Sequence, residues 1–134
     1  MAESTQRLEI VTPEKKVFTG DVNFVVVPGE LGELGIMPNH APLMSSLKIG
    51  LVRAQQEGKT FKFAVSGGFV EIRNNKVTIL ADTAESPEEI DRERAERAKE
   101  RAEKRVADKA CEGYDERRAE LALKRALNRL KAVQ

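Results

Sequence analysis

The side chains best suited to chemistry gather in residues 84–95, where acidic and basic groups follow one another closely. Two residues separate Ile90 and Asp91 from Arg94 and Ala95, and Glu85 lies just upstream. Carboxylates and guanidinium groups bind charged ligands through ion pairs and hydrogen bonds. The same residues also suit the first turn of an exposed helix, where acidic side chains complement the helix dipole. Taken alone, the pattern favours this second, purely structural interpretation.

No other set of side chains predicts catalysis. His40 is the only histidine and Cys111 the only cysteine, and neither belongs to an arrangement of nucleophile and base. The sequence has no ligand spacing typical of a metal site and no glycine-rich phosphate loop of the Walker type. It therefore predicts a protein that is not an enzyme.

The same stretch divides the chain into two predicted domains. Before it, β-branched and aromatic residues alternate between glycine and proline turns, and after it helix-forming residues continue almost to the end. Ser86 suits an N-cap, Pro87 suits the first helical position, and Glu89 can complete a capping box. We expect a first domain at 1–85 and a helical domain at 86–134.

Composition and charge narrow the function classes. The 134 residues carry 23 Lys plus Arg against 22 Asp plus Glu, a net charge of +1, whereas a nucleic-acid binder usually has a basic face. A single cysteine cannot form an internal disulfide, which fits a reducing compartment. No apolar run approaches the ~20 residues that cross a bilayer, and residues 1–6 do not resemble a signal peptide. We expect a soluble protein without nucleic-acid binding or membrane insertion.

Alternating apolar residues in the first domain predict short β-strands. The alternation is clearest near residues 8–10, 22–26, 51–55, 61–65, 69–73 and 77–81. Turn residues at 57–59, 66–68 and 74–76 separate several of these runs. Because many short strands follow one another without a helix between them, we expect an antiparallel β-sandwich or flattened barrel. With an antiparallel two-helix hairpin behind it, the fold class is α+β.

Residues 28–43 form a long predicted loop with an unusual composition. The segment has three prolines and three glycines, yet it keeps the apolar residues Leu31, Leu34, Ile36, Met37 and Leu43. These side chains either fold back onto the sandwich or contact a partner, and the sequence leaves both open.

Three segments of the first domain carry a specific resemblance. They are Gly-Glu-Leu-Gly-Ile at 32–36, Pro38 followed by His-Ala-Pro-Leu at 40–43, and Val-Ser-Gly-Gly-Phe-Val-Glu at 65–71. With the strand at 77–81 and the helical tail, they resemble the epsilon subunits of bacterial F-type ATP synthases, which are homologous to chloroplast epsilon and mitochondrial delta subunits. The resemblance implies a rotor subunit held peripherally at the cytoplasmic face of the bacterial cell membrane.

The resemblance also implies partners for the sandwich. In this family the sandwich grips the gamma subunit and stands on the ring of membrane c subunits. By this comparison Glu33, at a loop tip, lies near the polar loops of the c ring, and His40 and its neighbours lie near the gamma contact. A hydrogen-bonded loop histidine is an equally good interpretation of His40.

The second domain is predicted to be a weakly held helical hairpin. One helix carries the narrow apolar stripe Ala95, Ala98, Ala102 and Val106. After a stop at Gly113, a second helix from about residue 115 carries Ala119, Leu123, Ala126, Leu130 and Val133 on one seam. Each buried CH₂ contributes only about 0.8 kcal/mol, so a seam rich in alanine stabilises the closed hairpin marginally.

Several bacterial members of the family bind ATP on the folded tail through a motif of Ile or Leu, Asp, two variable residues, Arg and Ala. Ile90, Asp91, Arg94 and Ala95 match this motif position for position. The same comparison implies further nucleotide contacts at Glu85, Arg101, Arg125 and Arg129. Arginines seven or four residues apart share a helix face, so a closed hairpin could bring four guanidinium groups toward one polyphosphate. The competing interpretation is that these arginines pair with glutamates on solvated helices.

The resemblance implies a regulatory mechanism. In this family the folded tail permits activity, whereas the extended tail reaches beside gamma into the alpha/beta catalytic head and inhibits ATP hydrolysis. ATP would hold the tail down as a regulatory ligand, and the sequence leaves the need for magnesium open. The alternative function is a free-standing nucleotide-sensing adaptor that uses the sandwich to bind another partner.

Overall fold

The computed structural model describes residues 4–107 and 116–134 and divides the chain into two compact units. The first unit is Met1–Ser86 and the second is Pro87–Gln134. Described strands make up the first unit, and described helices make up the second. The predicted helix stop at Gly113, and Cys111, lie outside the described residues.

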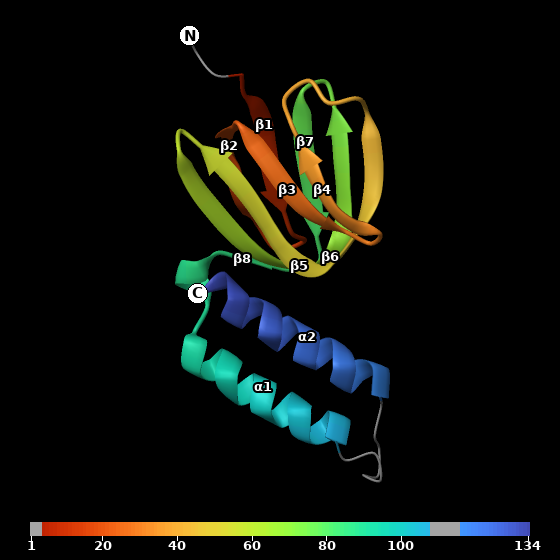
Figure 1. Ribbon diagram of the computed structural model, residues 1–134, viewed down its shortest axis with the longest axis vertical. Helices are drawn as coiled ribbons and strands as arrows, with labels where there is room; N and C mark the ends of the chain where they lie inside the picture. The colour runs from red at the N-terminus through yellow and green to blue at the C-terminus, as the bar shows by residue number, and fades with distance from the viewer. Residues whose placement is uncertain (1–3, 108–115) are drawn as a thin grey trace. The chain divides into compact units, whose positions relative to one another are not determined.

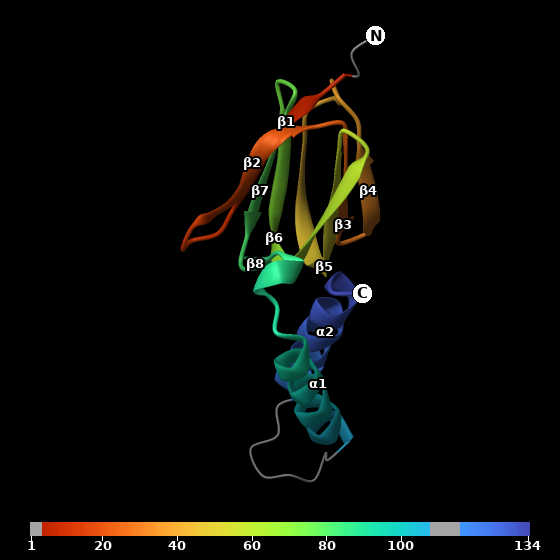
Figure 2. The ribbon, with the colours of Figure 1, turned by 90° about the vertical axis from the view of Figure 1, so that its left-hand side faces the viewer.

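The first unit is a β-sandwich made from one folded sheet. Its described strands are β1 (Gln6–Val11), β2 (Lys16–Val22), β3 (Phe24–Gly29), β4 (Gly32–Ile36), β5 (Leu43–Gln56), β6 (Lys59–Arg73), β7 (Lys76–Ala81) and β8 (Ala84–Glu85). They follow the order β2-β1-β7-β6-β5-β3-β4, and β8 pairs with β6. Figure 1 shows the strands face-on, and Figure 2 shows β1, β2 and β7 in one layer with β3 and β4 in the other.

Alternate side chains of these strands fill the space between the two layers, as the period of two requires. The fully buried ones include Leu8, Ile10, Val22, Val25, Val27, Ile36, Val52, Val70, Val77 and Ile79. The core cluster draws on all eight described strands, and the predicted sandwich of the α+β class is confirmed.

One strand pair departs from the predicted antiparallel arrangement. β1 and β7 run parallel, with Leu8 opposite Val77 and Ile10 opposite Ile79. All four side chains are fully buried, so this register aligns the apolar faces of the two strands. The local alternation predicts each strand correctly, but it does not specify which distant strand lies beside it or in which direction.

A second prediction, a turn at residues 66–68, is wrong. β6 continues through Gly67 and Gly68, and its register with β5 is the same on both sides of them. Both glycines have positive φ angles, 80° and 115°. A Cβ atom on Gly68 would lie 2.1 Å from the carbonyl oxygen of Leu80. Gly68 therefore allows a close approach to the end of β7, and Gly67 allows one to Asp82 just after it, where a side chain would not fit.

The predicted loop at 28–43 contains a strand. β4 pairs with β3 through a two-residue turn, with Gly29 opposite Gly32 and Val25 opposite Ile36. Its glycine-rich sequence has only one of the β-branched residues that usually indicate a strand, Ile36. Of the apolar residues in this segment, Ile36 is fully buried and Leu34 packs partly against the core, whereas Leu31 is fully exposed.

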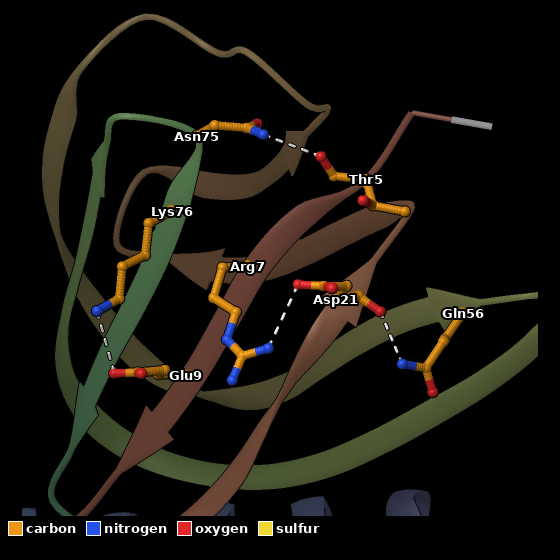
Figure 3. Close-up of polar contacts among 7 residues, drawn as sticks. All are labelled: Thr5, Arg7, Glu9, Asp21, Gln56, Asn75 and Lys76. Carbon is orange, nitrogen blue, oxygen red and sulfur yellow. Dashed lines mark hydrogen bonds and ion pairs between the residues drawn. The ribbon is translucent and has the colours of Figure 1, made fainter. Parts of the chain in front are cut away.

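Polar side chains connect the strands at one edge of the sandwich (Figure 3). Arg7 Nη1 lies 3.4 Å from Asp21 Oδ1, and Lys76 Nζ lies 3.4 Å from Glu9 Oε2. Gln56 Nε2 donates to the backbone carbonyl of Asp21 at 2.7 Å, which ties β2 to the end of β5. Exposed ion pairs of this kind contribute at most about 1 kcal/mol each.

The second unit begins with a single turn of 3₁₀ helix, η1 (Pro87–Glu89), followed by α1 (Arg92–Ala107) and α2 (Glu116–Ala132). We predicted Ser86 as the N-cap and Pro87 as the first helical residue, but the α-helix starts at Arg92, five residues after Pro87. Asp91 is its N-cap, since Asp91 Oδ1 accepts a hydrogen bond from the Arg94 N–H at 3.1 Å. The Asp91 carbonyl accepts the first helical bond from Ala95 N–H at 2.9 Å.

The two helices pack side by side in antiparallel directions (Figures 1 and 2). Buried alanines seven residues apart line their contact: Ala95 and Ala102 on α1, and Ala119 and Ala126 on α2. We call these four residues the alanine seam. Small side chains let two helices approach closely but bury little apolar area, so the seam contributes modestly to stability.

Candidate functional site

The alanine seam places the four candidate arginines on one side of the hairpin. Arg94 and Arg101 each precede a seam alanine of α1 by one position, and Arg125 does so on α2. Arg129 follows Ala126 by three positions, which brings it to the same flank because a helix turns about 100° per residue. In an antiparallel pair, corresponding flanks of the two helices lie on the same side. The hairpin therefore brings the four guanidinium groups to one surface.

The same geometry adds two arginines that sequence reasoning missed. We call this surface the basic flank, and its described arginines are Arg94, Arg101, Arg105, Arg118, Arg125 and Arg129. Arg105 is four residues after Arg101, and Arg118 is seven before Arg125, so the helical period could have found both. The opposite flank of the seam carries Glu96, Glu103 and Glu120 instead.

Most of the basic flank lacks acidic partners. Among the side chains of residues 4–107 and 117–134, no carboxylate lies within ion-pair distance of Arg94, Arg101, Arg105 or Arg125. Two helical ion pairs, Arg92–Glu96 and Lys99–Glu103, lie away from the basic flank. The interpretation in which glutamates neutralise the candidate arginines therefore does not describe Arg94, Arg101 or Arg125. An uncompensated row of guanidinium groups attracts an anion.

Of the four motif residues, only Arg94 directs a charged group away from the helix backbone. Ile90 is 9% exposed and Ala95 is 3% exposed. Asp91 caps the helix through the bond to Arg94 N–H. Arg94 is exposed on the basic flank. The motif thus has a structural function in the absence of ligand, whether or not it also binds one.

Glu85 belongs to the other unit. It lies in β8, opposite Ala64 of β6, and it is half-buried. The other predicted contacts, Arg94, Arg101, Arg125 and Arg129, all belong to the helical unit, whereas Glu85 belongs to the sandwich unit. Its contribution to nucleotide binding stays a prediction.

We predicted Glu33 at a loop tip, but it lies inside β4. The tip of this hairpin is formed by Glu30 and Leu31. Arg53 of β5 reaches across β3 to Glu33, with Nη2 2.6 Å from Oε2, and both side chains are exposed. An incoming partner would meet this acidic group as half of an ion pair.

His40 lies in the exposed segment between β4 and β5. Its Nδ1 lies 2.7 Å from the carbonyl oxygen of Ala41. The preceding residue, Asn39, has φ 63° and donates its N–H to Asn75 Oδ1 at 2.8 Å. The structure therefore contains the hydrogen-bonded loop histidine of the simpler interpretation, and an interface role for His40 stays a prediction.

The outer side of the sandwich carries an exposed apolar surface that the sequence analysis did not predict. Phe69 of β6 lies opposite Leu80 of β7 and opposite Ser46 of β5. Phe69 is 54% exposed, Leu80 53% and Met44 67%. We call Met44, Phe69 and Leu80 the outer apolar surface. The interruption of alternation at Leu80, which follows buried Ile79, is the sequence signal that could have found it.

Two classes of site are absent from the described residues. No group of three or more His, Cys, Asp or Glu side chains in 4–107 and 116–134 is arranged to hold a metal ion. In the same residues, no helix has both the length and the apolar character needed to cross a bilayer.

Comparison with known proteins identifies the class of chain that this fold and these surfaces define. Residues 5–87 match the family described as "ATP synthase, Delta/Epsilon chain, beta-sandwich domain", and residues 88–134 match "ATP synthase, Delta/Epsilon chain, long alpha-helix domain". The chain therefore belongs to the delta/epsilon family of ATP synthase chains.

Its curated relatives are epsilon chains. The ATP synthase epsilon chain of Desulforamulus reducens is 58% identical over 130 residues, which cover 97% of this chain and 98% of the relative. The epsilon chain of Pelotomaculum thermopropionicum is 64% identical over 109 residues, which cover 81% of each chain. An epsilon chain is a non-catalytic subunit of ATP synthase, so the predicted subunit without enzymatic activity is confirmed.

Solved structures show the same fold. A chain in the mitochondrial ATP synthase of Euglena gracilis is similar with a TM-score of 0.83 and 23% identity, over all of this chain and 85% of the other. A chain in the central stalk and c-ring structure from Tetrahymena thermophila has a TM-score of 0.60 and 15% identity, with both chains covered in full.

Proposed function

We propose that this epsilon chain is a rotor subunit that contacts gamma and the c ring through its sandwich and regulates ATP hydrolysis through its helical hairpin. In the closed hairpin, the basic flank binds ATP. In the open state, the helices extend along gamma into the alpha/beta catalytic head and inhibit hydrolysis. The protein then acts peripherally at the cytoplasmic face of the bacterial cell membrane.

The observation that carries the nucleotide part of this proposal is the shared side of the arginines. Arg94 and Arg101 extend from α1 beside Arg125 and Arg129 of α2. Like charges four residues apart on one helix oppose each other by a few tenths of a kcal/mol. A triphosphate that lies between the helices offsets this repulsion and forms charge-assisted hydrogen bonds with guanidinium groups.

Ligand linkage converts this binding into a switch. An anion that binds the closed hairpin and not the open one stabilises closure by RT ln(1 + [L]/Kd), about 2.7 kcal/mol at a hundred times Kd. The modest alanine seam makes a bias of this size sufficient to change which state prevails. Abundant ATP holds the helices closed, and scarce ATP releases them.

The sandwich supplies the proposed attachment. The outer apolar surface of Met44, Phe69 and Leu80 is suited to burial against gamma, since large apolar side chains contribute strongly to interfaces. The exposed segment around His40 is proposed to adjoin this contact. The Glu33–Arg53 pair, with Leu31 at the nearby tip, is proposed to face the polar loops of the c ring.

Calorimetric titration of the full chain with ATP and with ADP tests the nucleotide site, with and without magnesium. We expect ATP to bind, and Arg94→Ala and Arg101→Ala each to weaken it about tenfold, because a hydrogen bond to a charged group contributes about 1.5–3 kcal/mol.

Arg97→Ala is the matched control for this titration. Arg97 is an exposed arginine of α1 that lies away from the seam and the basic flank, so its removal deletes the same charge from the same helix. If Arg97→Ala weakens ATP binding as much as Arg94→Ala does, general charge attraction explains the binding and the site assignment is wrong.

A further inference from the structure

The six-residue motif at the start of α1 coincides with a helix-start motif of known geometry. With Asp91 as the N-cap, Ile90 is the preceding residue N′, Arg94 is N3 and Ala95 is N4. An apolar residue at N′ and another at N4 are the two positions of a hydrophobic staple, which fixes how the chain enters a helix. Both Ile90 and Ala95 are buried.

We propose that Asp91 is a positioning residue that acts through Arg94, and that it makes no contact with the bound nucleotide. This inference rests on the proposed nucleotide site and states which motif residues contact the ligand and which only position the helix. Asp91 and the Ile90–Ala95 staple set the first turn of α1, and Arg94 alone among the four motif residues binds the phosphates.

The hydrogen bond pattern supports this assignment. Asp91 Oδ1 accepts the N–H of Arg94 itself, at 3.1 Å, so the cap fixes the backbone of the residue whose side chain joins the basic flank. Ala95 at N4 belongs to the alanine seam, which aligns this turn with α2. The Asp91 carboxylate is stabilised by the backbone N–H that it caps. If it faced a triphosphate instead, the two negative groups would repel each other.

Substitutions that keep or remove the cap test the inference. Ser is a good N-cap with a short neutral side chain, and Ala is a poor one. We expect Asp91→Ala to weaken ATP binding about fivefold and Asp91→Ser to stay within about twofold of wild type. If Asp91 contacts the nucleotide directly, Asp91→Ser will bind as weakly as Asp91→Ala, and the inference is wrong.

Inorganic tripolyphosphate separates the two ends of the ligand. If Asp91 acts through Arg94, Asp91→Ala weakens binding of tripolyphosphate and of ATP by the same factor. A loss seen with ATP alone would assign Asp91 to the nucleoside and overturn the inference. In an Arg94→Ala background, Asp91→Ala should add no further loss, because coupled residues are not additive.

Amide hydrogen exchange at Arg94 in the nucleotide-free chain gives a readout independent of ATP. The cap protects this N–H, so exchange should accelerate in Asp91→Ala and not in Asp91→Ser. Equal exchange in wild type and Asp91→Ala would contradict the cap itself. The exchange result can support the cap while calorimetric titration of the wild-type chain with ATP detects no binding. In that case the proposed nucleotide site is wrong, and so is the ligand role assigned to Arg94.

Discussion

At the scale of single residues, backbone geometry accounts for several positions that side-chain chemistry alone does not. Ser86 and Asp91 are both good N-cap residues, and the sequence does not decide between them. The structure selects Asp91, which accepts the Arg94 N–H, after a separate turn closed by the bond from Ile90 N–H to Pro87 O. The sequence predicts that an N-cap residue lies near the start of this helix. Which of the two residues caps it depends on how α1 packs against α2 through the alanine seam.

Gly68 offers a residue-scale prediction about the sandwich. Gly68→Ala places a Cβ atom against the Leu80 carbonyl oxygen, at 2.1 Å in the unrelaxed structure. The backbone must shift to relieve this contact, and we expect a loss of about 2–4 kcal/mol in the free energy of unfolding. Urea denaturation followed by circular dichroism measures this loss.

Gly58 provides the control for that substitution. Its φ angle of 79° is also positive, but a Cβ atom there meets nothing within 4 Å. Gly58→Ala should therefore cost only the conformational strain, about 1 kcal/mol. Equal losses at both positions would show that strain, and not the close approach of the β7 backbone, explains the need for glycine at 68.

At the scale of elements, apolar periodicity predicts where strands and helices occur better than how they pair. The alternation identified β1 and β7, yet their parallel pairing joins segments almost seventy residues apart, which no local pattern encodes. β4 was hidden because Gly32 and Gly35 weaken its strand signal. The family resemblance singled out Arg94, Arg101, Arg125 and Arg129, and the antiparallel seam puts them on one side of the hairpin.

The alanine seam supports an element-scale prediction. Ala102 is 4% exposed, so Ala102→Leu forces the helices apart at a cost of about 1–3 kcal/mol. The basic flank depends on both helices, so this variant should also bind ATP more weakly in the calorimeter.

Ala107→Leu makes the same change at an exposed position of α1 and should leave ATP binding within about twofold. Weaker binding in both variants would indicate a general effect of added leucine. Unchanged binding in Ala102→Leu would show that nucleotide binding does not need close packing of the two helices.

At the scale of the whole molecule, the proposed function assigns attachment to the sandwich and regulation to the helical hairpin. The chain carries almost equal numbers of acidic and basic residues, so its charge pattern becomes visible only when the hairpin separates a basic flank from Glu96, Glu103 and Glu120. Family membership assigns the chain to ATP synthase. The shared flank of the arginines is what supports the proposal that its helices bind ATP.

The most direct test is the rate of ATP hydrolysis by the catalytic head with gamma and this chain, measured from low to high ATP. We predict that the wild-type chain inhibits strongly at low ATP and weakly at high ATP. A chain that ends at Ser86 should inhibit at neither concentration, and Arg94→Ala with Arg101→Ala should inhibit at both, because ATP no longer favours closure. If the double variant loses inhibition at high ATP just as wild type does, ATP bound to the basic flank does not control this protein.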